Sequence, residues 1–150
     1  MSNSWRGSVL PNLFQQYNRF SSEEISNLDM YQFGVLDGDS MKELSRMFCD
    51  LKFPINTFYG FDVFTGMPKE NAEPIFQEAW DPDIMPDAFN AVKRLQLDSP
   101  EQVAFHIEDQ VQRIYQNNNY STKVSVIPGL VEETMLTISA VSYTHLTLPT

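Results

Sequence analysis

The sequence has little cysteine, few basic residues and no long apolar run. Its single cysteine, Cys49, cannot form a disulfide within one chain, and the apolar neighbours Met47 and Phe48 indicate a buried thiol rather than a catalytic one. Ten residues are lysine or arginine and 20 are aspartate or glutamate, which gives a formal net charge of −10. This charge opposes binding to nucleic-acid phosphates and to anionic membranes.

The chain also lacks the segments that direct a protein to or across a membrane. No apolar run is long enough to cross a bilayer, and the N-terminal residues MSNSWRGSV lack the apolar centre of a secretory signal. The 150 residues, 42% of them apolar, are enough for one buried core. We therefore expect a single-domain cytoplasmic protein with no nucleic-acid and no membrane partner.

Residues 1–26 form a predicted N-terminal helical segment. Apolar side chains recur at helical spacing at Leu10, Leu13, Phe14, Tyr17 and Phe20. Residues 21–26 (SSEEIS) then offer capping residues and acids for a short helical turn. We expect the apolar stripe to pack on the part of the chain that follows.

Residues 27–48 (NLDMYQFGVLDGDSMKELSRMF) predict a strand, a glycine turn and a helix in succession. The apolar run from Met30 to Leu36 is typical of a buried strand. Gly34 and Gly38 then permit unusual dihedral angles or a close approach to the backbone. Ser40 and Glu43 have the spacing of a capping box, which predicts a helix from Ser40 to about residue 49.

This succession places amide groups and the positive end of a helix at the carboxyl end of a strand. Nucleotide-like ligands bind at such places in α/β sheets, although an ordinary tight turn has the same pattern. A second predicted strand, Thr57 to Asp62 (TFYGFD), ends on a carboxylate that could hold ribose hydroxyls. The spacing between the two strands fits one strand–helix–strand unit.

The rest of the chain continues the alternation. Helical spacing predicts a short helix over residues 88–97 and a longer one from Ser99 to about Tyr115, with Ser99, Pro100 and Gln102 as its start signals. A third strand is predicted at residues 123–127, before a helical turn at 130–135. The fold class is therefore α/β.

The long segment between the second predicted strand and the helix predicted at residues 88–97 has a functional and a structural interpretation. Trp80 and Phe76 could cover a ligand, but anchoring the loop to the core is the simpler role. The acids there have no recognised metal-binding spacing, and His106 lies among acids, so we predict no metal site and no catalytic histidine. These acids are Glu78, Asp81, Asp83 and Asp87.

The last ten residues, VSYTHLTLPT, resemble residue for residue the in-frame translation of a transposon-end adaptor used in sequencing-library kits. Such a segment is excluded from fold reasoning in the way that a tag is. We expect residues 140–150 to be a non-native tail and the natural sequence to stop near Ser139.

Three segments together resemble a known enzyme family: QFGVLDGDSMKEL, YGFDVFTGMPKE and VSVIPGLVEETM. Their succession is similar to that in class I S-adenosylmethionine-dependent methyltransferases, especially the macrocin O-methyltransferase family, over about residues 28–135. The second segment is the most specific. The first departs from the family pattern at Gln32, where an acid is usual, and an amide can only hydrogen-bond to the charged amino group of the cofactor.

The resemblance implies a Rossmann-like doubly wound sheet over residues 27–139, truncated after about three strands, with an N-terminal helix. It implies S-adenosylmethionine as cofactor and a small-molecule hydroxyl as methyl acceptor. The implied cofactor-binding residues are Gln32, Gly34, Gly38, Ser40, Asp62, Gly129 and Leu130. The catalytic base and the ligands of a divalent metal such as Mg²⁺ would lie beyond the third strand. We therefore expect this chain to contain half of the active site and to be an inactive fragment. A homo-oligomer is a separate possibility for the full-length protein.

Two other functions remain open from the sequence. An NAD(P)-binding oxidoreductase would share the strand, turn, helix and ribose acid, but its fingerprint needs three glycines, and Leu36 stands between Gly34 and Gly38. An interaction domain without a ligand is the third possibility, and cofactor binding distinguishes it from the other two.

Overall fold

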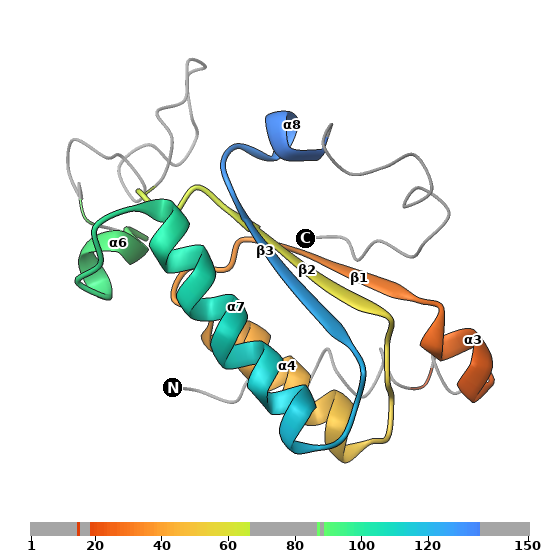
Figure 1. The fold of residues 1–150 in the computed structure, drawn as a ribbon. Helices are drawn as coiled ribbons and strands as arrows, with labels where there is room; N and C mark the ends of the chain where they lie inside the picture. Colours follow the sequence, from red (N-terminus) through yellow and green to blue (C-terminus); the bar gives the residue numbers. More distant parts are fainter. Residues whose placement is uncertain (1–14, 16–18, 67–86, 88, 136–150) are drawn as a thin grey trace.

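The computed structural model describes residue 15 and residues 19–66, 87 and 89–135 of the chain. In these ranges helices and strands alternate, except that α6 and α7 follow each other between β2 and β3 (Figure 1). In chain order the elements are α3 (Ser22–Ser26), β1 (Asp29–Phe33), α4 (Asp39–Asp50), β2 (Thr57–Asp62), α6 (Ala91–Arg94), α7 (Pro100–Asn117), β3 (Lys123–Pro128) and α8 (Val131–Thr134). No helix in this described part is long and apolar enough to span a membrane.

The three strands form one parallel sheet in the order β1-β2-β3. Tyr31 of β1 lies opposite Tyr59 of β2, and Tyr59 lies opposite Ser125 of β3. The long helices α4 and α7 run side by side along one face of the sheet (Figure 1). The predicted α/β class, with a Rossmann-like arrangement of three parallel strands and flanking helices, is confirmed.

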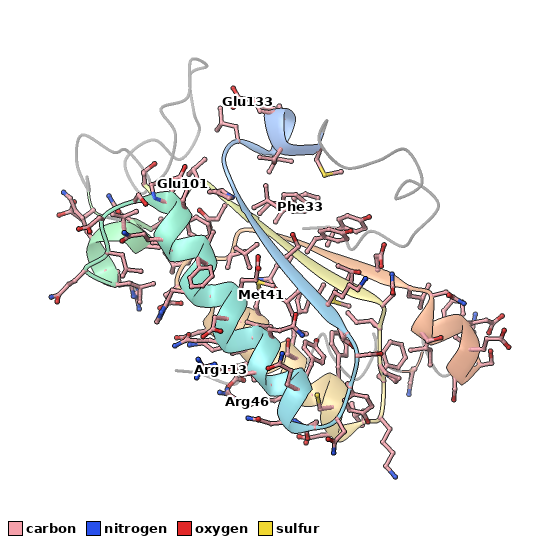
Figure 2. The ribbon with its side chains drawn as sticks, viewed as in Figure 1. Phe33, Met41, Arg46, Glu101, Arg113 and Glu133 are labelled. Carbon is pink, nitrogen blue, oxygen red and sulfur yellow. The ribbon has the colours of Figure 1, made fainter. Side chains whose placement is uncertain are left out.

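The main core lies between the sheet and the two long helices. Fully buried apolar side chains come from both layers, among them Phe58 of β2, Met41 and Phe48 of α4, and Ile107 of α7. Met41 lies on the helix side of the sheet (Figure 2). Gly60 of β2 makes this packing close, because a Cβ there would lie 2.6 Å from the Met41 sulfur.

Aromatic side chains cover the opposite face of the sheet. The rings of Tyr31 and Tyr59 stack with centroids 5.0 Å apart, and those of Phe33 and Phe61 stack at 5.2 Å. Phe33 lies on the side of the sheet away from α7 (Figure 2). Cross-strand aromatic pairs of this kind stabilise adjacent strands in register.

Side chains of α7 complete the hydrogen bonding of β3 on the side away from β2. The Gln112 amide accepts from the Val124 N–H at 2.9 Å and donates to the Thr122 carbonyl at 2.8 Å, as a neighbouring strand would. Glu108 accepts from the Val126 N–H at 3.0 Å. An edge strand covered in this way is a poor template for pairing with another chain.

Several predicted details are confirmed. β2 has the predicted bounds, the short helical turn predicted at residues 21–26 forms as α3, and the Cys49 thiol is buried. The predicted N-cap Ser99 of α7 is confirmed, since it accepts from the Gln102 N–H at 3.2 Å. The prediction of Gln102 as its capping-box partner is wrong, because the Gln102 side chain accepts from the Asp98 N–H and not from the Ser99 N–H.

Other details are wrong. Strand β1 ends at Phe33, so Val35 and Leu36 belong to the turn, and the helix predicted over residues 88–97 is one turn long. The predicted capping box of Ser40 and Glu43 does not form, because the N-cap of α4 is Gly38 and Ser40 is already the second residue of the helix. Three predictions lie largely or wholly outside the described residues. They concern the apolar helical stripe before residue 21, the roles of Phe76 and Trp80, and the non-native tail at residues 140–150.

Candidate functional site

The carboxyl ends of the three strands are joined by backbone hydrogen bonds. The Gly34 N–H, just after β1, donates to the Phe61 carbonyl at 2.9 Å. The Gly129 N–H, just after β3, donates to the Asp62 carbonyl at 3.0 Å. The turn after β1, the end of β2 and the turn after β3 therefore meet at one edge of the sheet.

The Asp62 carboxylate binds the turn that follows β1. Its Oδ2 accepts from the N–H groups of Val35 and Leu36, both at 2.8 Å, and its Oδ1 accepts from the Phe64 N–H at 2.8 Å. A carboxylate has about four acceptor positions, so about one remains for another donor. The resemblance implies that Asp62 holds ribose hydroxyls. In this geometry most of its acceptor capacity is used by the backbone.

Gln32, on the helix side of β1, connects the strand to the turn and to α4. Its Nε2 donates to the Gly34 carbonyl at 3.0 Å and to the Ser40 hydroxyl at 2.7 Å. Its Oε1 is buried and accepts no hydrogen bond from any described residue. A buried amide oxygen without a donor costs about 1–3 kcal/mol.

Gly34 and Gly38 both have a left-handed backbone, with φ of 87°, but their surroundings differ. A Cβ on Gly38 would lie 2.7 Å from Ile107 Cγ2, so this glycine lets α7 pack against the start of α4. A Cβ on Gly34 would have no described heavy atom within 4 Å. Among the described residues the space beside Gly34 is therefore open, as a ligand that approaches the backbone requires.

Acidic residues complement the start of α4. Asp37 accepts from the Asp39 N–H at 3.3 Å, and its other oxygen lies 3.1 Å from Arg94 Nε. Asp39 lies in the first turn of the helix, 3.3 Å from Lys42 Nζ. Because carboxylates already interact with the positive end of the helix, this end is poorly suited to bind a phosphate.

The turn after β3 borders the same edge. Gly129 has φ of 131°, and a Cβ there would lie 2.9 Å from Thr134 Cγ2, so the residue must be small. Leu130 is half-buried, and its carbonyl accepts from the N–H groups of Glu133 and Thr134 to begin α8. Leu130 is thus next to the edge through Gly129.

Most of the predicted cofactor-binding residues come together at this edge. Hydrogen bonds link Gln32 with Gly34 and Ser40, and link Asp62 with Gly129 and the turn. The described residues contain no group of three or more His, Cys, Asp or Glu side chains arranged to bind a metal. His106 is exposed on α7, as expected.

Three site contacts were not predicted from the sequence. They are the Gln32–Ser40 hydrogen bond, the Asp62 bonds to the turn and the Arg94–Asp37 ion pair. Each joins residues that are separated along the chain, and local patterns contain no signal for such pairs. The acids at Asp37 and Asp39 were a partial signal, since acids favour a helix start.

The described part therefore defines a Rossmann-like α/β fold whose strand ends form a single edge site. No protein-family model, curated protein or solved structure matches the chain. The resemblance to methyltransferases accordingly stays a prediction, supported below by the geometry of the site alone.

Proposed function

We propose that the protein is an S-adenosylmethionine-dependent methyltransferase that acts on a hydroxyl group of a small molecule. The observation that carries this proposal is the Gln32 oxygen, which is buried at the carboxyl end of β1 beside Gly34 and accepts no hydrogen bond from the described residues. A ligand with an amino group next to a slender chain fits these two features. The methionine part of S-adenosylmethionine is such a ligand.

The Gln32 oxygen is oriented by its own amide. Because Nε2 donates to the Gly34 carbonyl and to Ser40, Oε1 is fixed as an acceptor. An ammonium donor would satisfy it with a charge-assisted hydrogen bond. A neutral amide in place of the usual acid would hold the amino group more weakly, since the acid adds an ion pair.

The remaining site residues have roles that follow from their positions. Gly34 leaves space for the methionine part, Gly38 allows Ile107 to pack against the start of α4, and Ser40 holds Gln32. The remaining acceptor position of Asp62 is available to one ribose hydroxyl, and Gly129 and Leu130 would border the adenine. The cofactor supplies an electrophilic methyl group, and catalysis consists largely of positioning an acceptor hydroxyl in line with it and removing its proton.

The proposal assigns no catalytic base and no metal ligand to the described residues. A base and a divalent metal such as Mg²⁺ belong to the part of the site that the resemblance assigns to residues beyond the third strand. The acceptor is a small molecule, and we propose that the reaction takes place in the cytoplasm.

An NAD(P)-dependent oxidoreductase is the alternative that shares this edge. Its pyrophosphate needs free amides at the start of the helix. Here Asp37 accepts from the first helical amide, and Leu36 occupies the position of the second glycine and packs on the core. Both features favour a ligand without phosphate groups.

Calorimetric titration tests the proposal. S-adenosylhomocysteine and NADH are titrated separately into the wild-type protein and into the variants Gln32→Leu, Asp62→Ala and Gln116→Leu. The last variant is the matched control, because Gln116 is exposed on α7. We expect micromolar binding of S-adenosylhomocysteine alone, weakened about tenfold to a hundredfold by Gln32→Leu through loss of a hydrogen bond to a charged group, reduced by Asp62→Ala, and unchanged by Gln116→Leu.

Two results would contradict the proposal. Binding of NADH would favour the oxidoreductase. Binding of neither ligand would favour an interaction domain.

A further inference from the structure

The turn after β1 contains a small group of converging amides. The N–H groups of Val35 and Leu36, which are consecutive in the chain, both point at Asp62 Oδ2, each at 2.8 Å. Consecutive amides that converge in this way form an anion-binding nest, the kind of concavity in which many proteins bind phosphate. In this protein the anion in the nest is a carboxylate of the chain itself.

The backbone of the donors is unusual. Leu36 has φ of 55° and Phe64 has φ of 64°, left-handed values that are unfavourable for residues with side chains. Both residues donate their N–H groups to the Asp62 carboxylate, Leu36 to Oδ2 and Phe64 to Oδ1. Hydrogen bonds to a charged acceptor offset the strain, so the conformation of the turn depends on Asp62.

Asp62 joins all three strand ends, but through two different groups, its side chain and its main chain. Besides its bonds to the turn after β1, Asp62 accepts the Gly129 N–H on its own carbonyl at 3.0 Å. A change at Asp62 therefore affects the turn at β1 through the side chain, while the contact with the turn after β3, made by the main chain, is retained. This separation makes the role of the side chain testable.

We propose that Asp62 is an internal anion that fills the amide nest of Val35 and Leu36, holds the turn in its left-handed conformation and excludes ligands that carry phosphate at this position. Asp62 is thus a positioning and specificity-determining residue. The occupation of the nest is independent of the proposed function. The selection of a phosphate-free cofactor over a dinucleotide, in contrast, rests on the proposed function.

The physical basis of the exclusion is both steric and electrostatic. The two amides have no capacity for a second strong acceptor while Oδ2 accepts from both. A phosphate at the same place would also lie within a few ångströms of a like charge in a partly buried site, where screening is weaker than in water. Removal of the carboxylate should convert the nest into an anion site.

The test is a titration of inorganic pyrophosphate followed by the amide resonances of the wild-type protein, Asp62→Ala and Asp62→Asn. We expect no saturable shift of the Val35 and Leu36 amides in the wild type, and saturable millimolar binding at both amides in Asp62→Ala. Asp62→Asn should gain little, because an amide oxygen still fills the nest. Pyrophosphate binding at these amides in the wild type, or its absence at them in folded Asp62→Ala, would overturn the proposal.

Amide hydrogen exchange keeps the proposal testable if Asp62→Ala does not fold. In Asp62→Asn, exchange at Val35 and Leu36 should rise about tenfold or more, because a charged acceptor has been replaced by a neutral one. The Thr57 amide, which donates to Asp29 at 3.1 Å at the other end of the sheet, is the internal control. Unchanged exchange at Val35 and Leu36 would contradict the proposal.

These measurements use no cofactor. A failure to bind S-adenosylhomocysteine would remove the proposed function and leave the filled nest. If Asp62 proves not to fill the nest, the proposed cofactor is still tested separately, by the titration of S-adenosylhomocysteine.

Discussion

The two ends of the sheet each contain an aspartate that bridges β1 and β2, but the two aspartates lie in different surroundings. Asp29, at the start of β1, is 6% exposed, and its Oδ1 accepts from Asn56 Nδ2 at 2.9 Å and from the Thr57 N–H at 3.1 Å. Asp62, at the end of β2, is half-buried and accepts from the turn after β1. One carboxylate joins strand starts, and the other holds a turn.

We interpret the amino end of the sheet as the end that stabilises the fold and the carboxyl end as the end that binds a ligand. At the amino end, the buried Thr122 hydroxyl donates to the Ile55 carbonyl at 2.6 Å, and Asp29 satisfies the amide at the start of β2. Among the described residues, the carboxyl end has an open space beside Gly34 and a buried Gln32 oxygen that accepts no hydrogen bond. Ligands of parallel sheets bind at the carboxyl ends of the strands, where such features are useful.

The largest effect that we expect on stability is that of Gly38→Ala, compared with Gly34→Ala. Both substitutions place a side chain on a left-handed residue, which costs about 1–2 kcal/mol. Gly38→Ala also forces its Cβ against Ile107, for a total loss of about 3 kcal/mol. Urea unfolding of the two variants measures the difference.

Gly38→Ala and Gly34→Ala also distinguish an effect on stability from an effect on ligand affinity within the carboxyl end. The new Cβ in Gly34→Ala occupies the open space, so this variant should lose affinity for S-adenosylhomocysteine while it stays the more stable of the two. Equal losses of stability in the two variants would contradict the packing of Ile107 against Gly38.

The next effect concerns the amino end. Asp29→Ala leaves the buried N–H of Thr57 without its acceptor, which should lower the free energy of unfolding by about 2 kcal/mol. The affinity for S-adenosylhomocysteine should not change, since Asp29 lies at the opposite end of β1. Asp98→Ala, at an exposed aspartate, is the control for the lost charge. A loss of affinity as large as that in Asp62→Ala would remove the distinction between the two ends.

The elements were predictable where local pattern decides them. Strand β2 and the start of α7 follow from an apolar run and from the consecutive Ser99 and Pro100, and both formed as predicted. Ser40 shows the limit of local pattern. Its spacing to Glu43 indicates a cap, but the hydroxyl accepts from Gln32, eight residues away, and the helix starts after a left-handed glycine instead. A tertiary contact overrode the local preference.

The candidate site shows the same limit more strongly. The sequence predicted that Gly34, Asp62 and Gly129 lie at strand ends, because parallel strands bring their carboxyl ends to one edge. It did not predict that the Asp62 carboxylate would accept hydrogen bonds from the Val35 and Leu36 amides, which lie far from it along the chain. That contact depends on the register of β1 against β2 and on the left-handed turn, neither of which has a local signature.

The smallest effect concerns pH and the helix layer, remote from the candidate site. Burial raises the pKa of the Tyr115 phenol well above its ordinary value of 10.0, the neighbouring Ser45 hydroxyl opposes the shift, and Cys49 adds to it. The folded state therefore keeps the proton when the unfolded chain loses it. The contribution is complete below pH 10.0 and is lost as the pH rises toward the folded pKa.

Tyr115→Phe isolates this contribution. Between pH 8 and 11 the wild type should lose about 1 kcal/mol more stability than the variant, because one proton difference changes the free energy by about 1.4 kcal/mol per pH unit. Urea unfolding at the two pH values measures it, with Tyr120→Phe as the control from a less buried phenol. Identical pH dependence in Tyr115→Phe and the wild type would mean that the phenol ionises in the folded state as readily as in the unfolded chain. The expected difference would assign this part of the alkaline sensitivity to the buried Tyr115 phenol between α7 and α4.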